Sequence, residues 1–269
     1  MKRQSSNGNG MMVIHKVQAE LASRAGRGAM VAEFLGTLLF IVFSAGTVAV
    51  TGGLLAERMT SARLLAVALA SGVSYAVFVG AAMPVSGGHL NPAVTFAALM
   101  SKQIHAAKAL VYMVSQCAGA VAGALLLMVM IPSSMHGSLG SDMLAARVSV
   151  GGGLVTEIVL SSVLVAAVLA AARGGSPVRL AVVGLVVMLG ELVGAPLTGG
   201  SMNPARSFGP ALIGWTSPEA AGVWRHHWIY WLGPTMGGCL AALVHSLALW
   251  PRGGEKTTRA LPSANERSA

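Results

Sequence analysis

Long apolar stretches separated by short polar connections make up most of this chain. Each stretch approaches the roughly 20 mostly apolar residues that an α-helix needs to cross a lipid bilayer. Charged residues are scarce inside the stretches and gather in the connections and at the two ends. The pattern therefore predicts six membrane-spanning helices, at about residues 30–50, 62–83, 107–131, 152–172, 178–197 and 228–250.

The composition agrees with this pattern and excludes an ordinary soluble domain. Of the 269 residues, 54% are hydrophobic and only 10% are charged, and the mean hydropathy is +0.69. Such values indicate an all-α integral membrane protein. We expect a cytoplasmic N-terminal tail at 1–29, one membrane domain at 30–250 with halves at about 30–131 and 152–250, and a cytoplasmic C-terminal tail at 251–269. Within the first tail, residues 11–24 favour an amphipathic surface helix and a disordered segment about equally.

An eight-residue pattern occurs twice, following the second and the fifth predicted spans. The copies read Ser-Gly-Gly-His-Leu-Asn-Pro-Ala at 86–93 and Thr-Gly-Gly-Ser-Met-Asn-Pro-Ala at 198–205. Asn is a good helix N-cap and Pro suits the first helical position, so each copy predicts the start of a helix. The apolar runs that follow end near Lys102 and Gly214, and about 10–14 residues are too few to cross a bilayer. We therefore expect two re-entrant half-helices.

The two copies lie in halves of opposite orientation. Three spans separate equivalent points, and an odd number reverses the direction of the chain through the membrane. The half-helices are therefore expected to meet N-terminus to N-terminus near the midplane, in an inverted three-span repeat. Glu33 and Glu157 occupy matching places in the first span of each half. They are expected to accept hydrogen bonds from the irregular backbone that leads into each half-helix.

The charge distribution predicts the orientation in the membrane. The net charge is +9, and most Lys and Arg residues lie in the two tails and in connections on the same side. Both termini are thus expected to be cytoplasmic, in the plasma or inner membrane. The basic residues favour contact with anionic lipid headgroups over a nucleic-acid surface. No phosphate-binding Gly-rich loop and no metal-ligand spacing occurs, so we expect no enzyme, no cofactor and no metal.

The sequence resembles the aquaporin (major intrinsic protein) family over nearly all of residues 30–250. The resemblance rests on both Asn-Pro-Ala boxes and on Ala-Glu-Phe-Leu-Gly-Thr at 32–37, Gln-Cys-Ala-Gly at 116–119 and Asn-Pro-Ala-Arg-Ser-Phe-Gly-Pro at 203–210. It implies a homotetramer with one pore in each protomer. It also implies that the boxes line the pore centre, through Asn91, Pro92, Ala93, Asn203, Pro204 and Ala205. His89 would border the cytoplasmic part of the pore, although ordinary hydrogen bonding to the loop is an equally good interpretation.

The physics of such a pore gives the two asparagines a role. The half-helices direct positive dipole ends, and the amides of Asn91 and Asn203, at the centre. A cation meets a barrier there, and a water molecule held by both amides cannot relay a proton. We therefore expect a passive channel that excludes protons and ions.

Arg206 is the sole cation predicted at membrane depth. A charged side chain there is energetically costly unless it faces a water-filled cavity. The resemblance places it in the outer constriction, with Ser71, Glu191 and Gly200 assigned by their offsets from the boxes. A one-residue shift would substitute Gly72 or Leu192. Small Ser71 and Gly200 predict a wide, polar constriction, similar to the nodulin-related branch that passes metalloid acids. Water together with glycerol, urea or arsenous acid is expected to pass, with a strict water channel as the alternative.

Glu191 is the least ordinary residue of the predicted constriction. A carboxylate within the membrane is energetically costly, and a salt bridge to Arg206, hydrogen bonds or a bound proton would each offset that cost. We favour pairing with Arg206 or solvation of the carboxylate. A proton-coupled transporter that uses Glu191, and a membrane scaffold without a pore, remain alternatives. Asp142 and the other acids are expected in tails or outer connections, without partners for acid–base chemistry. His105 is expected to be a solvated surface residue rather than a pH sensor.

Overall fold

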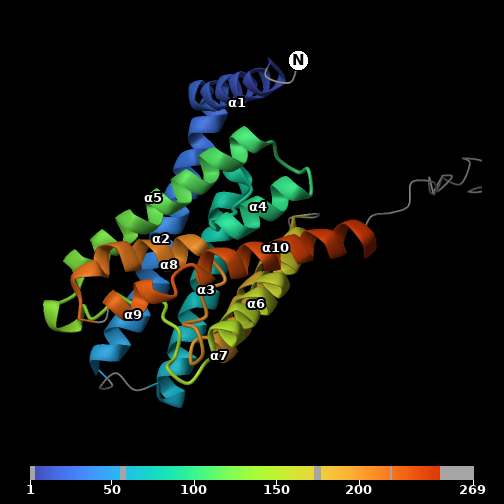
Figure 1. Cartoon of the computed structure of the whole chain (residues 1–269). Coiled ribbons are helices and arrows are strands. Elements are labelled where there is room, and N and C mark those ends of the chain that lie inside the picture. The colour runs from blue at the N-terminus through green and yellow to red at the C-terminus, as the bar shows by residue number, and fades with distance from the viewer. Residues whose placement is uncertain (1–3, 55–58, 173–176, 219, 249–269) are drawn as a thin grey trace, which may run out of the picture.

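The computed structural model of the chain describes residues 4–54, 59–172, 177–218 and 220–248. These parts of the chain form helices joined by short connections (Figure 1). The predicted C-terminal tail at 251–269 lies outside the described residues. The α-helices are α1 (Gln4–Ala22), α2 (Arg24–Leu54), α3 (Ser61–Ser86), α4 (Pro92–Met100), α5 (Ala106–Met130), α6 (Val150–Ala171), α7 (Pro177–Gly194), α8 (Pro204–Ile213), α9 (Ala220–Arg225) and α10 (Ile229–Ala248), with short 3-10 turns at Ser133–Met135 and Gly214–Thr216.

Each of the six predicted spans falls on one long helix. Four of these helices, α2, α3, α5 and α6, contain a segment that is long and apolar enough to cross a membrane. In the second half, α7 and α10 take the places that α3 and α5 have in the first, and they complete the six. The expected all-α membrane fold is confirmed. The helix α2 begins at Arg24, before the apolar stretch starts, because the intrahelical hydrogen bonds continue where the side chains become polar.

The packing of the helices repeats between the halves. In the first half α2 packs along α5, and in the second α6 packs along α10 in the same way. The helices α3 and α7 pack against each other across the two halves. The half-helices are exchanged, since α4 packs mainly on α10 and α8 packs mainly on α5. This reciprocal packing is what an inverted repeat requires, and it brings the two Asn-Pro-Ala boxes together.

Glycines allow the paired long helices to approach closely. A Cβ atom added at Gly123 of α5 would lie 2.5 Å from the Leu38 carbonyl oxygen of α2. One added at Gly237 of α10 would lie 2.5 Å from the Ile158 carbonyl oxygen of α6. Small residues at helix contacts are a common way to pack helices within lipid.

We expect Gly123→Ala to destabilise the protein by about 1–3 kcal/mol, because the added methyl group must push α2 away from α5. Thermal unfolding in detergent measures this loss. Gly151→Ala is the matched control, since a Cβ atom there meets nothing within 4 Å on α6. That variant should be neutral or slightly more stable. Equal melting temperatures for the two variants would contradict the close-packing argument.

The N-terminal helix α1 lies outside the bundle, beyond the end at which α2 begins (Figure 1). Of the two alternatives for this segment the structure has the helix, and it rests against α5 and α2. Glu20 Oε1 lies 2.9 Å from His105 Nε2, and His105 Nδ1 accepts a hydrogen bond from the Lys108 backbone N–H. His105 is an exposed surface residue, as predicted, and it also contacts Glu20.

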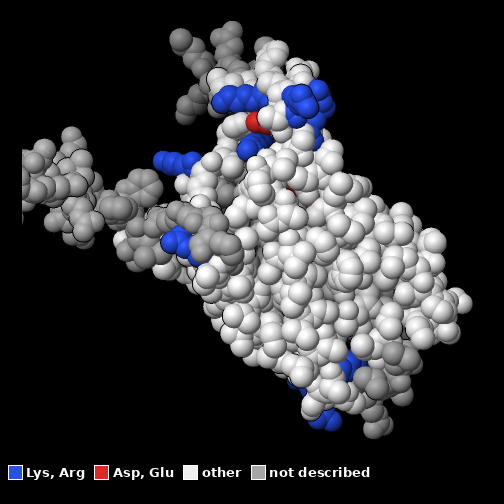
Figure 2. All heavy atoms as spheres, turned by 180° about the vertical axis from the view of Figure 1, so that it is seen from behind, with Lys and Arg blue, Asp and Glu red and all other residues white. Residues whose placement is uncertain are grey.

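The surface separates into charged ends and an uncharged middle. Figure 2 shows one face on which Lys and Arg side chains gather at the two ends, and a broad area between them carries neither. Large apolar side chains such as Leu39, Phe43 and Val73 are exposed on the long helices. Apolar area of this extent is suited to lipid or to a protein partner.

Candidate functional site

The loops that lead into α4 and α8 have the same backbone conformation. In each loop both glycines and the residue before Asn have positive φ, namely Gly87 (96°), Gly88 (63°) and Leu90 (49°), and Gly199 (93°), Gly200 (72°) and Met202 (51°). Glycine is needed at Gly88, because a Cβ atom there would lie 2.5 Å from the Val79 carbonyl oxygen. The sequence repeat is therefore also a structural repeat.

Each loop ends in an asparagine that caps the following half-helix. Asn91 Oδ1 accepts a hydrogen bond from the Ala93 N–H at 2.8 Å, and Asn203 Oδ1 accepts one from the Ala205 N–H at 3.0 Å. Pro92 and Pro204 begin the two helices, as predicted. At about 1.5 Å per residue, 9 and 10 residues reach roughly half of a 30 Å bilayer core.

The two asparagine amides also connect the half-helices to each other. Asn91 Nδ2 donates to the Met202 carbonyl oxygen at 2.8 Å, and Asn203 Nδ2 donates to the Leu90 carbonyl oxygen at 2.9 Å. Each amide thus fixes the loop of the opposite half. One of its two N–H groups is used for this purpose, and the other can bind a further acceptor.

Glu33 of α2 organises the first loop. Its Oε1 accepts from the Ser86 hydroxyl at 2.6 Å and from the His89 N–H at 2.9 Å. Its Oε2 accepts from the Leu90 N–H and from Gln116 Nε2, both at 2.7 Å. The predicted hydrogen bonds to irregular backbone are present, and they satisfy the backbone N–H groups of His89 and Leu90 at membrane depth.

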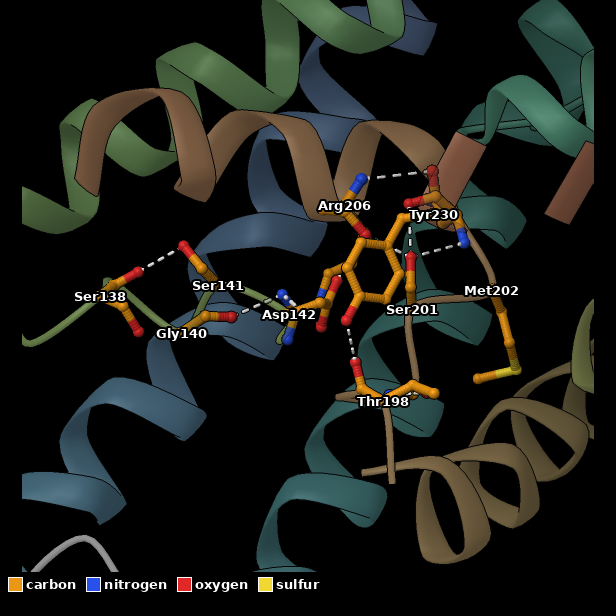
Figure 3. A network of polar contacts seen from close by, with 12 residues as sticks. Ser138, Gly140, Ser141, Asp142, Thr198, Ser201, Met202, Arg206 and Tyr230 are labelled. Carbon is orange, nitrogen blue, oxygen red and sulfur yellow. Dashed lines mark hydrogen bonds and ion pairs between the residues drawn. The ribbon is translucent and has the colours of Figure 1, made fainter. Parts of the chain in front are cut away.

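Glu157 of α6 serves the second loop in the same way. Its Oε1 accepts from the Thr198 hydroxyl at 2.6 Å and from the Ser201 N–H at 3.2 Å, and its Oε2 accepts from the Met202 N–H at 2.9 Å. The Tyr230 hydroxyl of α10 donates to the Thr198 carbonyl oxygen at 2.7 Å (Figure 3). Both loops are thus held rigidly by side chains of the long helices.

His89 lies half-buried at the start of the first box. Its Nδ1 is 3.0 Å from the Thr95 hydroxyl, and that hydroxyl also accepts from Gln116 Nε2 at 2.9 Å. Because Thr95 is an acceptor toward Gln116, its own hydrogen is free to be donated to His89 Nδ1. The structure thus gives His89 a hydrogen-bonded place in the loop.

The predicted constriction residues Ser71, Glu191 and Arg206 are at most 2% exposed. Ser71 Oγ, Glu191 Oε2 and Arg206 Nε are among the buried polar atoms of the described residues that have no hydrogen bond of normal geometry, although the Ser71 hydroxyl lies near the Glu191 carboxyl group. Buried polar atoms without a partner are rare and point to a bound water molecule or solute. Gly72, the alternative to Ser71, lies in the contact between α3 and α7, where a Cβ atom would be 2.5 Å from the Gly184 carbonyl oxygen.

The Glu191 side chain fills space that the sequence was expected to leave open. A Cβ atom added at Gly200 would lie 2.6 Å from Glu191 Oε2. The small size of Gly200 therefore accommodates the carboxyl group of α7 beside the backbone, and it does not by itself widen the passage.

Arg206 is paired with Asp142, which lies in the connection between α5 and α6. Arg206 Nη1 lies 3.3 Å from Asp142 Oδ1 and donates to the Gly140 carbonyl oxygen at 2.6 Å (Figure 3). Of the two favoured possibilities for Glu191, the ion pair with Arg206 is not found, since within the described residues the ion pair of Arg206 is with Asp142, and solvation of Glu191 stays a prediction. Asp142 lies in a connection between spans, as expected, but its pairing with Arg206 was not predicted.

Asp142 is itself firmly fixed. Its Oδ2 accepts from the Ser207 hydroxyl at 2.6 Å, and Ser207 in turn contacts the Ser201 hydroxyl. Burial raises the pKa of the Asp142 carboxyl group above its usual value, and the Arg206 guanidinium acts in the opposite direction. Asp142 is the only acidic residue between 131 and 149, but the sequence does not indicate its partner.

Comparison with known proteins identifies the family. Residues 20–245 match the sequence model of the family described as "Major intrinsic protein". The chain belongs to the major intrinsic protein family. It is 38% identical to "Aquaporin-4" of Homo sapiens over 229 residues (83% of this chain, 68% of the relative), and 39% identical to "Lens fiber major intrinsic protein" of Gallus gallus over 237 residues (87% and 86%). It is 40% identical to "Probable aquaporin TIP3-2" of Arabidopsis thaliana over 238 residues (83% and 84%).

A solved structure has the same fold. The X-ray structure of the aquaglyceroporin from Plasmodium falciparum superposes with a TM-score of 0.74 at 19% identity, covering 82% of this chain and 96% of that one. This major intrinsic protein is therefore a multi-pass membrane channel of the aquaporin family, for water and small solutes, and not an enzyme.

Proposed function

We propose that this channel passes water and small uncharged solutes, such as glycerol, urea or arsenous acid, and that it excludes protons and ions. The observation that carries the proposal is the set of unpartnered polar atoms on Ser71, Glu191 and Arg206, buried beside the second box. They belong to three different helices, α3, α7 and α8. Leaving such atoms unsatisfied costs about 1–3 kcal/mol each, so a passing hydroxyl, amide or water would be stabilised there.

Protons and cations are excluded at the centre of the pore, where the N-termini of α4 and α8 meet. Each terminus carries about half a positive charge. The amides of Asn91 and Asn203, each with one N–H bound to the opposite loop, lie at these termini. Water held by both amides directs its oxygen toward them and cannot pass a proton onward.

Neutral solutes are selected at the constriction. Ser71 Oγ and Glu191 Oε2 supply acceptors, and Arg206 Nε supplies a donor. Hydroxyl-rich solutes match this set better than ions do. We also propose a closer resemblance to the nodulin-related, metalloid-permeable branch of the family. Its support is limited to Ser71, Gly200 and the loop residues, since the relatives named above are not described as members of that branch.

A strict water channel is the second candidate, and one observation favours it. The Glu191 carboxyl group lies beside Gly200, and the constriction residues are almost fully buried. The third candidate, a proton-coupled transporter, depends on Glu191 cycling between protonation states.

Stopped-flow light scattering on vesicles that contain the purified protein separates these candidates. Shrinkage in sucrose measures water permeability, and reswelling in glycerol, urea or arsenous acid measures solute entry. We expect both rates to exceed those of empty vesicles by about tenfold or more, because the constriction offers unpartnered polar groups to water and solutes. Swelling confined to water would support the strict water channel. Solute-driven proton flux that Glu191→Gln abolishes would defeat the channel proposal.

We further propose the membrane setting and the assembly. The channel domain at 30–250 would lie in the cell membrane with both tails cytoplasmic, because basic residues dominate that side of the sequence. The exposed apolar residues Leu39, Phe43 and Val73 would contact lipid or neighbouring protomers of a homotetramer.

A further inference from the structure

Asp142 occupies a position from which it controls the guanidinium of Arg206. It is 1% exposed and contacts Arg206 Nη1, the Ser207 hydroxyl and the backbone at Gly199, where an added Cβ atom would lie 2.7 Å from Asp142 Oδ1. Figure 3 shows that Asp142 and Gly140 approach Arg206 from the same connecting segment. The side chain is thus buried, with Oδ2 fixed by Ser207 and Oδ1 directed to Arg206.

This arrangement divides the hydrogen-bonding groups of Arg206 between two sides. Nη1 is engaged by Asp142 and Gly140, whereas Nε has no partner among the described residues. Glu191 Oε2 is also without a hydrogen-bond partner. The Glu191 carboxyl group and the Arg206 guanidinium therefore lie in one constriction, while the ion pair of Arg206 among the described residues is with Asp142.

We propose that Asp142 is a specificity-determining positioning residue, which neutralises Arg206 and so keeps Arg206 Nε and Glu191 Oε2 free to bind a hydroxyl-bearing or amide-bearing solute. This inference rests on the proposed function. Pairing with Asp142 also lowers the positive field of Arg206 at the constriction. Exclusion of cations then falls mainly on the centre, where the two asparagines lie.

The decisive variant is Asp142→Asn, which preserves the shape and the contact with Ser207 but removes the charge. The uncompensated guanidinium then finds its best remaining partner in the Glu191 carboxylate, and this pair closes the constriction to solutes wider than water. We expect the ratio of urea to water permeability to fall by about tenfold, the size of coupling typical of contacting charged groups. Adding Glu191→Gln removes the new partner, so the double variant should return to within about twofold of Glu191→Gln alone.

Controls keep the outcome interpretable. Ser141→Ala changes the same connection, since its hydroxyl donates to the Ser138 carbonyl oxygen, but it does not touch Arg206 and should leave the ratio unchanged. If Asp142→Asn fails to reach vesicles, Ser207→Ala removes the hydroxyl that fixes Asp142 Oδ2 and should lower the ratio in the same direction.

Two further results would overturn the inference. One is an unchanged ratio in both variants, and the other is simple additivity of Asp142→Asn and Glu191→Gln. If wild-type vesicles conduct neither water nor urea, the proposed function itself fails, which separates the two hypotheses.

Discussion

Glu33→Ala should prevent the protein from folding into a stable helical bundle. The carboxylate accepts four hydrogen bonds, from Ser86, His89, Leu90 and Gln116. Hydrogen bonds to a charged group contribute about 1.5–3 kcal/mol each, and a whole protein is typically stable by only about 5–15 kcal/mol. Alanine also leaves the backbone N–H groups of His89 and Leu90 without acceptors at membrane depth. The summed loss is therefore comparable with the total stability.

Size-exclusion chromatography and thermal unfolding in mild detergent measure the effect. We expect Glu33→Ala to aggregate. Glu33→Gln should fold but melt at a markedly lower temperature, because one oxygen becomes an N–H group that faces a donor. The matched control is Glu20→Ala, which removes a carboxylate from α1 and should cost at most about 1 kcal/mol, as a partly exposed ion pair does. Normal folding of Glu33→Ala would show that the loop is held by packing rather than by the carboxylate.

The sequence was sufficient for the features that depend on local chemistry. Apolar length predicted the spans, and Asn followed by Pro predicted where α4 and α8 begin. The matching places of Glu33 and Glu157 predicted their bonds to the loops, because a buried carboxylate near irregular backbone has few other uses. Each of these signals lies within a short stretch of chain and is repeated in the second half.

The parts that were missed depend on contacts between distant segments. Asp142 lies in a connection without periodicity, so nothing local indicates that it folds back onto Arg206, 64 residues later. The predicted pairing of Glu191 with Arg206 rested on charge alone. Residue spacing does not indicate which of two carboxylates lies closer to the guanidinium. Similarly, the fit of the Glu191 carboxyl group against Gly200 follows from the contact of α7 with the second loop.

Helix boundaries were less well predicted for a physical reason. Apolar composition measures contact with lipid, whereas a helix continues for as long as its backbone bonds do. The helix α2 thus extends from Arg24 to Leu54, past both ends of its apolar stretch. The short helix α1 had no apolar signal, and it is held in part by the pair of Glu20 with His105.

Asn91→Asp is expected to convert the channel into one that leaks protons and cations. Aspartate caps a helix as well as asparagine does, so α4 keeps its start. The variant loses the bond from Nδ2 to the Met202 carbonyl oxygen and places a negative charge where two positive helix ends meet. A unit charge at about 4 Å and an effective dielectric constant near 20 is worth about 4 kcal/mol, which corresponds to roughly a thousandfold change in cation entry.

A pH-sensitive dye trapped in vesicles with an imposed pH gradient measures the leak, and sucrose-driven shrinkage checks that the pore still conducts water. Asn91→Ala is the matched control, because it removes the amide without adding charge, and we expect a far smaller leak. Asn203→Asp should behave as Asn91→Asp does, since its amide makes the reciprocal bond to the Leu90 carbonyl oxygen. If both aspartate variants conduct water and stay proton-tight, the barrier does not arise from the meeting helix ends. It would then have to lie at the constriction, where Asp142 already offsets the charge of Arg206.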